Sequence, residues 1–292
     1  MQEKGIRRRN FLKSFAAGSA AGWTSAAAAA ASAQEIKVKG RIQQSVCRGN
    51  WRDYPWDEFL PACKEMGLVG VDLVGQGDWP AIKKHGMIAT MCPGAGSIKN
   101  GLNNKNNHPR FLNDFKKNIQ AAAGNGWRNV ITMAGDRRGV DDEEGMENCR
   151  LILQEAVKMA EDSGVTICME LLNSKVDHPG YMCDHTAWGV ELCKRVASPH
   201  FKLLYDIYHM QIMEGDIIRT IRTNIDYIGH FHTAGNPGRK DLDDRQELQY
   251  KPIMEAIADL TEQGKYNGFV AHEFGPKHKL DSLRQAVQIC DV

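Results

Sequence analysis

Short apolar runs alternate with amphipathic stretches along nearly the whole chain, from residue 41 to residue 289. The apolar runs are rich in Val, Ile and Leu, as buried strands are, and the stretches between them carry apolar residues at helical spacing. The predicted strands are 41–46, 70–74, 87–91, 129–133, 165–173, 201–206, 227–231 and 268–273. The predicted helices are 56–66, 80–85, 111–124, 142–163, 188–196, 216–223, 248–263 and 280–289. Eight strand–helix units in roughly 250 residues are typical of an α/β protein built as a (β/α)8 TIM barrel.

Two further observations favour a single barrel. A doubly wound sheet that binds a dinucleotide would carry a Gly-rich turn after its first strand, and this chain has none there. No linker or shift in composition divides residues 34–292, so we predict that they form one domain. The segment 93–108 is rich in Gly and Asn and is predicted to be a long loop, for which a lid is one role.

The first 33 residues have the pattern of an export signal. Arg8 and Arg9 precede Asn-Phe-Leu-Lys, as in twin-arginine signals, and a small Ala/Gly-rich stretch follows. The sequence Ala31-Ser-Ala33 provides an A-x-A cleavage site. The alternative is a disordered basic tail. We predict a twin-arginine signal peptide at residues 1–33, the barrel at residues 34–292 and a periplasmic location.

The charge balance excludes some partners. Removing residues 1–33 deletes five basic residues and one acidic residue, which changes the formal charge from +1 to −3. A mildly acidic protein lacks the basic surface that phosphate backbones require, so nucleic acid is not predicted as a partner. After the N-terminal segment no apolar run reaches the roughly 18 to 20 residues that span a bilayer, so no stable membrane association is expected. The sequence leaves open whether the protein forms a homo-oligomer.

The eight cysteines do not form a recognisable metal or redox motif, because none has C-x-x-C spacing. An even number of cysteines in an exported protein is compatible with disulfides. Twin-arginine substrates, however, fold before export in a reducing compartment, so we predict buried free thiols rather than a disulfide framework.

Acidic residues stand at the ends of three predicted strands, where a barrel places its functional groups. They are Glu170, Asp206 and Glu273, and His232 follows the strand between the last two. An unpaired buried carboxylate is costly, so each calls for a partner. A salt bridge or helix cap explains one such acid, whereas four groups on adjacent strands predict a site for one divalent metal ion. Their mixed oxygen and nitrogen ligands suit Mn²⁺, Mg²⁺, Co²⁺ or Zn²⁺ without choosing among them.

Other polar residues near these strand ends are candidates for binding a substrate. Asn173 is the last residue of the predicted fifth strand, and His209 lies in the predicted loop after the sixth. Arg239 lies in a turn where its guanidinium is suited to a carboxylate or hydroxyl groups. His230 shares a strand face with His232, and the residue nearer the strand end is preferred as the ligand. Two further groups are assigned no function: the charged residues 136–138, predicted to be solvated, and the aromatic Trp51 and Trp56, which more often belong to a core.

Four segments of the chain resemble hydroxypyruvate isomerases, members of the wider xylose isomerase-like sugar isomerase and epimerase barrels. The segments are Ile167-Cys-Met-Glu-Leu-Leu-Asn-Ser174, Asp206-Ile-Tyr-His-Met-Gln211, Ile228-Gly-His-Phe-His-Thr-Ala-Gly-Asn-Pro-Gly-Arg239 and His272-Glu-Phe-Gly-Pro276. The resemblance implies that Glu170, Asp206, His232 and Glu273 bind the metal, and that Glu170 and Glu273 also transfer protons. It further implies that His209, Arg239 and Glu247 contact the substrate.

The chain departs from that pattern at three places. It has His232 where hydroxypyruvate isomerases usually carry Gln and ketose 3-epimerases carry His. It has Val176 where the epimerases carry a second Glu. The isomerases usually continue with His-Glu-Pro after Pro-Gly-Arg, whereas this chain continues with Lys240-Asp-Leu242. Val176 favours an isomerase and His232 favours an epimerase.

The predicted reaction is a metal-dependent isomerisation of a small α-hydroxycarbonyl compound, either a sugar or a hydroxy-keto acid, of the aldose–ketose type. A metal ion that binds adjacent carbonyl and hydroxyl oxygens acidifies the proton on carbon and stabilises the resulting enediolate, and paired glutamates move the proton. The alternatives on the same barrel are a ketose 3-epimerase and a keto-sugar dehydratase or lyase. Outside enzymes, the alternative is a periplasmic sugar-binding protein.

Overall fold

The computed structural model describes residues 38–292. The predicted signal peptide at residues 1–33 lies outside the described residues, so the signal, its cleavage site and the periplasmic location stay predictions.

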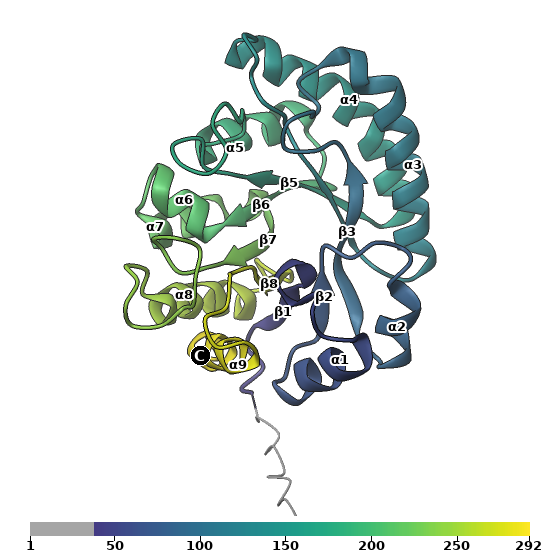
Figure 1. Ribbon diagram of the computed structural model, residues 1–292. Coiled ribbons are helices and arrows are strands. Elements are labelled where there is room, and N and C mark those ends of the chain that lie inside the picture. Colours follow the sequence, from purple (N-terminus) through teal and green to yellow (C-terminus); the bar gives the residue numbers. More distant parts are fainter. Residues whose placement is uncertain (1–37) are drawn as a thin grey trace, which may run out of the picture. The chain divides into compact units, whose positions relative to one another are not determined.

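Eight parallel strands form a closed barrel in which each strand pairs with the next one in the sequence and β8 pairs with β1 (Figure 1). This arrangement confirms the predicted (β/α)8 barrel. The strands are β1 Gln43–Cys47, β2 Gly70–Asp72, β3 Ile88–Ala95, β4 Asn129–Thr132, β5 Thr166–Leu171, β6 Phe201–Asp206, β7 Ile228–Thr233 and β8 Phe269–His272.

The helices surround the strands and connect each strand to the next. The α-helices are α1 Trp56–Glu65, α2 Trp79–Lys84, α3 His108–Gly124, α4 Asp142–Ser163, α5 Thr186–Val196, α6 Ile207–Met213, α7 Ile217–Asn224, α8 Tyr250–Glu262 and α9 Leu280–Cys290. Short 3₁₀ helices are Arg48–Trp51, Lys105–Asn107 and Ile225–Tyr227. Helix α4 has the predicted bounds, and Gly164 ends it in the left-handed conformation that a Cβ disfavours, with φ of 64°.

The structure corrects two local predictions. The residues after β6 were predicted to be a loop, but they form helix α6, whose first turn is capped by the side chain of Asp206. The predicted loop 93–108 is shorter than expected, because β3 continues to Ala95 and a 3₁₀ turn leads directly into α3. Short apolar runs next to Gly and Asn leave such boundaries undetermined in the sequence.

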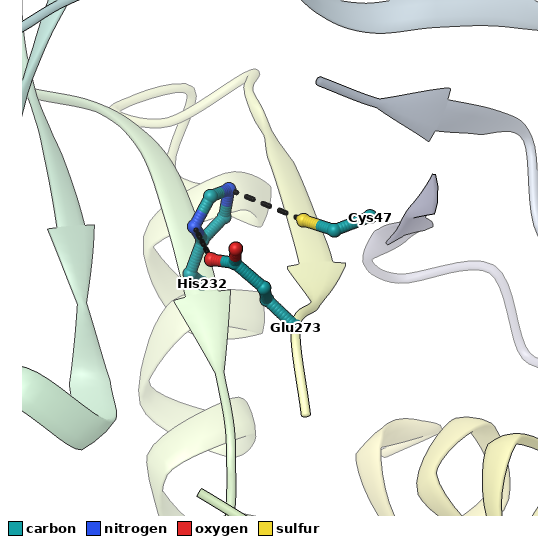
Figure 2. Close-up of side chains that lie close together, drawn as sticks. All are labelled: Cys47, His232 and Glu273. Carbon is teal, nitrogen blue, oxygen red and sulfur yellow. Dashed lines mark hydrogen bonds and ion pairs between the residues drawn. The ribbon is translucent and has the colours of Figure 1, made fainter. Parts of the chain in front are cut away.

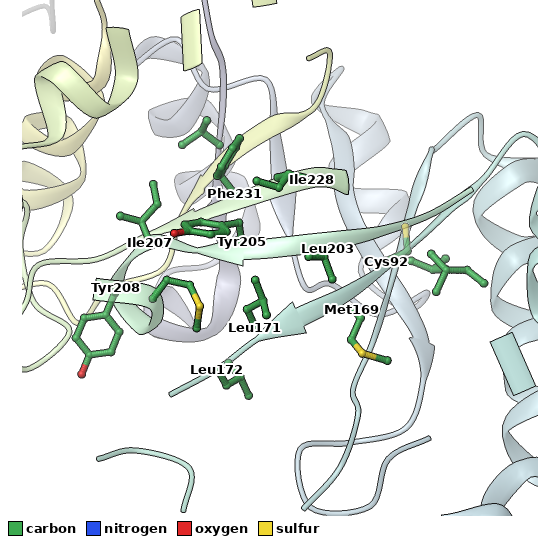
Figure 3. Close-up of a cluster of buried hydrophobic side chains, with 14 of the residues drawn as sticks. Cys92, Met169, Leu171, Leu172, Leu203, Tyr205, Ile207, Tyr208, Ile228 and Phe231 are labelled. Carbon is green, nitrogen blue, oxygen red and sulfur yellow. The ribbon is translucent and has the colours of Figure 1, made fainter. Parts of the chain in front are cut away.

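Alternate residues of each strand face opposite sides of the barrel wall. On β5 and β6, Met169, Leu171, Leu203 and Tyr205 belong to the large hydrophobic layer that packs against the helices, part of which is drawn in Figure 3. Cys168 and Leu204, one residue out of phase, pack with Met91 in a separate small cluster. This alternation places Glu170 and Asp206 on the same side as that small cluster, which is the interior of the barrel.

Gly94 lies at a point where β3 and β4 approach more closely than a side chain allows. The register between them shifts between Pro93 and Ala95, and a Cβ on Gly94 would overlap the backbone oxygen of Ile131. We expect Gly94→Ala to lower the free energy of unfolding by about 1–3 kcal/mol, because the clash is with backbone that cannot move aside. Gly124→Ala is the matched control, since nothing lies within 4 Å of that Cβ and alanine favours a helix. Urea unfolding of both variants tests this, and equal stability of the Gly94 variant and the wild type would contradict it.

All eight cysteines are buried and unpaired, in agreement with the predicted free thiols. None of the helices in the described residues is both long and apolar enough to cross a membrane.

Candidate metal and substrate site

The structure brings the four predicted ligands together at the carboxyl ends of the strands. Glu170 lies on β5, Asp206 ends β6, His232 lies on β7 and Glu273 directly follows β8. One ligand atom from each lies within 4.8 Å of the others. The register contributes directly, because Asp206 pairs with His232 across β6 and β7. We call these four residues the ligand cluster.

His232 is at the centre of the ligand cluster and is completely buried. Its Nδ1 lies 2.8 Å from Glu273, 3.3 Å from Glu170 and 4.0 Å from Asp206, counted to the nearest carboxylate oxygens. Figure 2 shows the imidazole between the Glu273 carboxylate, near Nδ1, and the Cys47 thiol, which lies 3.7 Å from Nε2. Nδ1 is buried and has no partner with hydrogen-bond geometry within residues 38–292. His232, rather than His230, therefore faces the carboxylates, as preferred from the sequence.

The two carboxylate oxygens of Asp206 have different surroundings. Oδ1 accepts a hydrogen bond of 3.1 Å from the backbone N–H of His209 and so caps helix α6. Oδ2 lies on the side of the ligand cluster, 3.0 Å from Nη2 of Arg239. The helix-cap explanation of this acid is therefore correct for Oδ1, whereas Oδ2 lies where a metal ligand is predicted, and that role stays a prediction.

Arg239 reaches the ligand cluster from the loop after β7. Its Nη2 donates to Asp206 and, at 2.7 Å, to Glu273. Burial works against the charged guanidinium, but Glu273 and Asp206 raise the pKa of Arg239 overall. Its Nε is buried without a partner among the described residues. Arg239 thus offsets the charges of two carboxylates of the ligand cluster.

Asn173 fixes the tautomer of His209, that is, which of its ring nitrogens carries the proton. Oδ1 of Asn173 accepts from the backbone N–H groups of Val176 and Asp177 at 3.1 and 2.8 Å, which fixes the orientation of the amide. The amide nitrogen therefore faces Nδ1 of His209, at 2.6 Å. Since an amide nitrogen only donates, Nδ1 accepts and the proton is on Nε2. Burial, with a contribution from Arg239, lowers the pKa of His209 well below its usual value and keeps the ring neutral.

The free N–H of His209 is a donor beside the ligand cluster. Its Nε2 lies 3.7 Å from Oδ2 of Asp206 and is buried without a hydrogen-bond partner among residues 38–292. The ring of His178, which the sequence prediction did not include, lies 5.3 Å from the His209 ring. Together with Nε of Arg239, His209 provides N–H groups that suit the oxygen atoms of a small polar substrate.

Glu247 is not brought into the ligand cluster. It is exposed, and its Oε1 accepts hydrogen bonds from the side chains of Asn236 and Gln211. In this structure it supports the loop that carries Arg239, and its predicted contact with substrate stays a prediction.

Other predicted positions are explained by packing. Trp51 is buried against Phe59 and Phe274, as a core residue. Arg137 is half-buried and forms ion pairs with Asp142 and Asp184, so its role is to hold loops together.

The sequence prediction missed Asp72, which lies at the end of β2 and is completely buried. Nε2 of His230 and Nε2 of His232 lie 2.7 and 3.0 Å from its Oδ2. The signal was present in the sequence, because an acid inside the apolar run 70–74 needs a partner as much as Glu170 does.

The surroundings shift the pKa values of Glu170 and Glu273 in opposite directions. Burial raises the pKa of Glu170. The negative charges of Glu273 and Asp206 raise it further, whereas His232 lowers it, and the overall shift is upward. Burial also works to raise the pKa of Glu273, but Arg239 and His232 lower it overall. Two carboxyl groups whose pKa values are moved apart are suited to different steps of a proton transfer.

The residues fit a divalent metal ion. Three carboxylates and one imidazole are ligands for Mn²⁺, Mg²⁺, Co²⁺ and Zn²⁺, and Nδ1 of His232 faces the carboxylates, 2.8 Å from Glu273. Arg239 already offsets part of the charge of Asp206 and Glu273, and a divalent cation would offset the negative charge that remains on the three carboxylates.

The fold and the ligand cluster define a (β/α)8 barrel with a candidate metal and substrate site at the carboxyl ends of its strands. The chain belongs to the xylose isomerase-like TIM barrel family, whose model matches residues 24–290. This agrees with the resemblance found in the sequence motifs.

Relatives within this group have different activities in their names. The chain is 34% identical over 122 residues to a 2-oxo-tetronate isomerase of Cupriavidus necator, which covers 42% of this chain and 45% of the relative. It is 33% identical over 125 residues to the hydroxypyruvate isomerase of Escherichia coli, with 43% and 46% covered. It is 35% identical over 147 residues to a D-psicose 3-epimerase of Ruminiclostridium cellulolyticum, with 50% and 45% covered. The chain thus matches about half the length of these relatives.

A solved structure agrees with the fold over a longer range. The structure of an AP endonuclease, family 2, from Brucella melitensis superposes with a TM-score of 0.74 at 24% identity, covering 82% of this chain and 96% of that one. At this identity the likeness supports the barrel fold alone.

Proposed function

We propose that this protein is a metal-dependent isomerase that acts on a small α-hydroxycarbonyl compound, in the manner of hydroxypyruvate isomerases. The observation that carries the proposal is the convergence of Glu170, Asp206, His232 and Glu273 at the barrel mouth. The relatives named hydroxypyruvate isomerase and 2-oxo-tetronate isomerase support the reaction class.

The four residues of the ligand cluster would hold the metal ion. When bound, a divalent ion polarises the carbonyl and hydroxyl oxygens of a substrate and stabilises the negative charge that develops as a carbon-bound proton leaves. His209 and Arg239 would supply further electrostatic stabilisation, because His209 Nε2 and Arg239 Nε have no hydrogen-bond partner among residues 38–292 and could donate to substrate oxygens.

Glu170 and Glu273 are the candidates for moving the proton. In the proposed reaction one carboxylate removes the proton from the carbon that bears the hydroxyl group, and an enediolate forms. The other glutamate, in its protonated form, then returns a proton to the neighbouring carbon. The hydroxyl proton passes to the oxygen of the former carbonyl, so that carbonyl and hydroxyl exchange places. The neutral His209 cannot act as a strong base in this site, because burial disfavours its charged form.

A ketose 3-epimerase is the second candidate. His232 and the D-psicose 3-epimerase relative favour it. Val176, where epimerases carry Glu, argues against it, and its side chain is 64% exposed. However, the next residue, Asp177, directs its carboxylate back to Asn173 and Tyr208, at 2.7 and 2.9 Å. A carboxylate is therefore present next to Asn173 and Tyr208. The absence of Glu at position 176 is thus weaker evidence for an isomerase over an epimerase than the sequence alone indicated.

Solvent exchange distinguishes these candidates from one another and from a sugar-binding protein. We expect metal-loaded protein in D₂O to incorporate deuterium into one compound of a panel of small ketoses and hydroxy-keto acids that includes hydroxypyruvate. NMR identifies the carbon that exchanges and the product that accumulates. An aldehyde–ketone pair identifies an isomerase, an inverted carbinol an epimerase and a dehydrated product a lyase. Binding without exchange for every compound that binds would contradict an enzymatic role.

A further inference from the structure

Asp72 is a buried anion that the proposed proton transfer does not use. It receives donors from three other strands of the barrel: Ser45 of β1, Thr90 of β3, and His230 and His232 of β7. All five side chains are at most 1% exposed. Every lone-pair direction that a carboxylate commonly uses is therefore occupied by a hydrogen-bond donor.

The donors are divided between the two oxygens of Asp72. Oδ1 accepts from the hydroxyl groups of Ser45, at 3.2 Å, and Thr90. Oδ2 accepts from Nε2 of His230 at 2.7 Å and from Nε2 of His232 at 3.0 Å. Since an ionised carboxylate only accepts, both imidazoles carry a proton on Nε2.

This arrangement decides which nitrogen of His232 is available to a ligand. A neutral imidazole with its proton on Nε2 has its lone pair on Nδ1. Nδ1 is the atom on the side of the ligand cluster, 2.8 Å from Glu273 and 3.3 Å from Glu170. The hydrogen bond to Asp72 also fixes the plane of the ring, because a rotation that exchanged the two nitrogens would break it.

We propose that Asp72 is a positioning residue: it fixes the tautomer and orientation of His232 so that the Nδ1 lone pair faces Glu170, Asp206 and Glu273. The inference rests on the proposed metal-dependent function, since a metal ion needs that lone pair. Carboxylates that hydrogen-bond the second nitrogen of a ligating histidine orient the ring and increase its basicity. Asp72, His230 and His232 are also close enough to bind a metal themselves. We favour hydrogen bonding because the four donors already satisfy the carboxylate.

The wild-type protein tests the inference directly. The full chain is labelled with ¹⁵N-histidine and loaded with Zn²⁺, which is diamagnetic. Two-bond ¹H–¹⁵N correlations report the state of each ring nitrogen, and His232→Gln identifies the His232 signals. We expect one Zn²⁺ per chain, bound through Nδ1 of His232, with the proton on Nε2. Zn²⁺ on Nε2, or a second Zn²⁺ bound by His230, would overturn the inference.

The same measurement separates this inference from the proposed function. If Zn²⁺ binds through Nδ1 and none of the panel compounds exchanges deuterium, the function is wrong and the role of Asp72 stands. If Zn²⁺ binds through Nε2 and exchange occurs, the role of Asp72 is wrong and the function stands. If Zn²⁺ does not bind, both are wrong.

A pair of variants tests the role energetically. Asp72→Asn keeps the size of the side chain but loses the charge and one acceptor, and we expect the Zn²⁺ dissociation constant to rise about 10–100-fold in competition with a chelating indicator. Thr90→Val is the matched control, because it removes another donor to the same carboxylate without touching His232. It should leave the affinity and the His232 tautomer near those of the wild type. Equal losses in both variants, or none in Asp72→Asn, would contradict the proposal, and the wild-type spectrum decides the case if Asp72→Asn does not fold.

Discussion

Replacing Glu170 or Glu273 by glutamine is expected to reduce turnover by about 10²–10⁴-fold, the usual contribution of a positioned acid or base. Glutamine has nearly the same shape but neither accepts nor returns a proton at neutral pH. The measurement is the rate of deuterium exchange and of product formation with the compound that reacts in the panel. Near wild-type rates in either variant would rule out the paired-glutamate mechanism.

Stability measurements on the metal-free variants show whether turnover is lost because the proton transfer fails or because the protein unfolds. Burial raises the pKa of Glu170, so its charged form weakens the fold increasingly as pH rises through that pKa. Glu170→Gln resembles the protonated form, and its melting temperature at pH 7 should equal or exceed that of the wild type. Glu273→Gln loses the 2.7 Å ion pair with Arg239 and should melt lower. Glu161→Gln, at an exposed position of α4, is the control for the substitution itself and should retain full activity.

Removal of divalent ions is expected to abolish turnover and to lower thermal stability. The three carboxylates of the ligand cluster lie close together, with Glu170 and Asp206 buried and Glu273 partly exposed, and a bound cation would offset their repulsion. A ligand present at 100 times its dissociation constant stabilises the folded state by about 2.7 kcal/mol, or roughly 5–10 °C in melting temperature for a domain of this size. Activity assays and thermal unfolding after treatment with a chelator measure both effects.

Restoring the ion identifies it and controls for the chelator. We expect at least one of Mn²⁺, Mg²⁺, Co²⁺ and Zn²⁺ to restore both activity and melting temperature. Asp206→Ala, which removes one ligand and also the cap of α6, should lose the metal-dependent part of the stabilisation. Undiminished turnover after exhaustive chelation would show that the ligand cluster works without a metal.

The alternation of strands and helices along the chain was sufficient to predict the barrel, because each strand is an apolar run and each helix has one apolar face. Strand β6 and helix α4 have the bounds read from the sequence. Helix α6 was missed because its seven residues carry no polar face. Five of them are buried, so no helical periodicity distinguishes them from a buried loop or strand.

The sequence by itself also determined which residues form the ligand cluster. A charged side chain at the end of an apolar run is informative alone, since burial without a partner is costly, and the period of two along a strand gives its side of the sheet. Glu170, Asp206, His232 and Glu273 could therefore be selected before any distance was known.

Only the tertiary structure decided what each polar atom does. Barrel closure brings β2 opposite β7, so that Asp72 meets residues 158 and 160 positions away in the chain. Such contacts leave no local pattern, because they depend on strand order and register rather than on spacing along the chain. The structure also shows that the oxygens of Asp206 are divided between the cap of α6 and the ligand cluster, and that Glu247 is exposed. The sequence determines which polar side chains stand at the strand ends. The order and register of the strands in the closed barrel determine which of them meet across it.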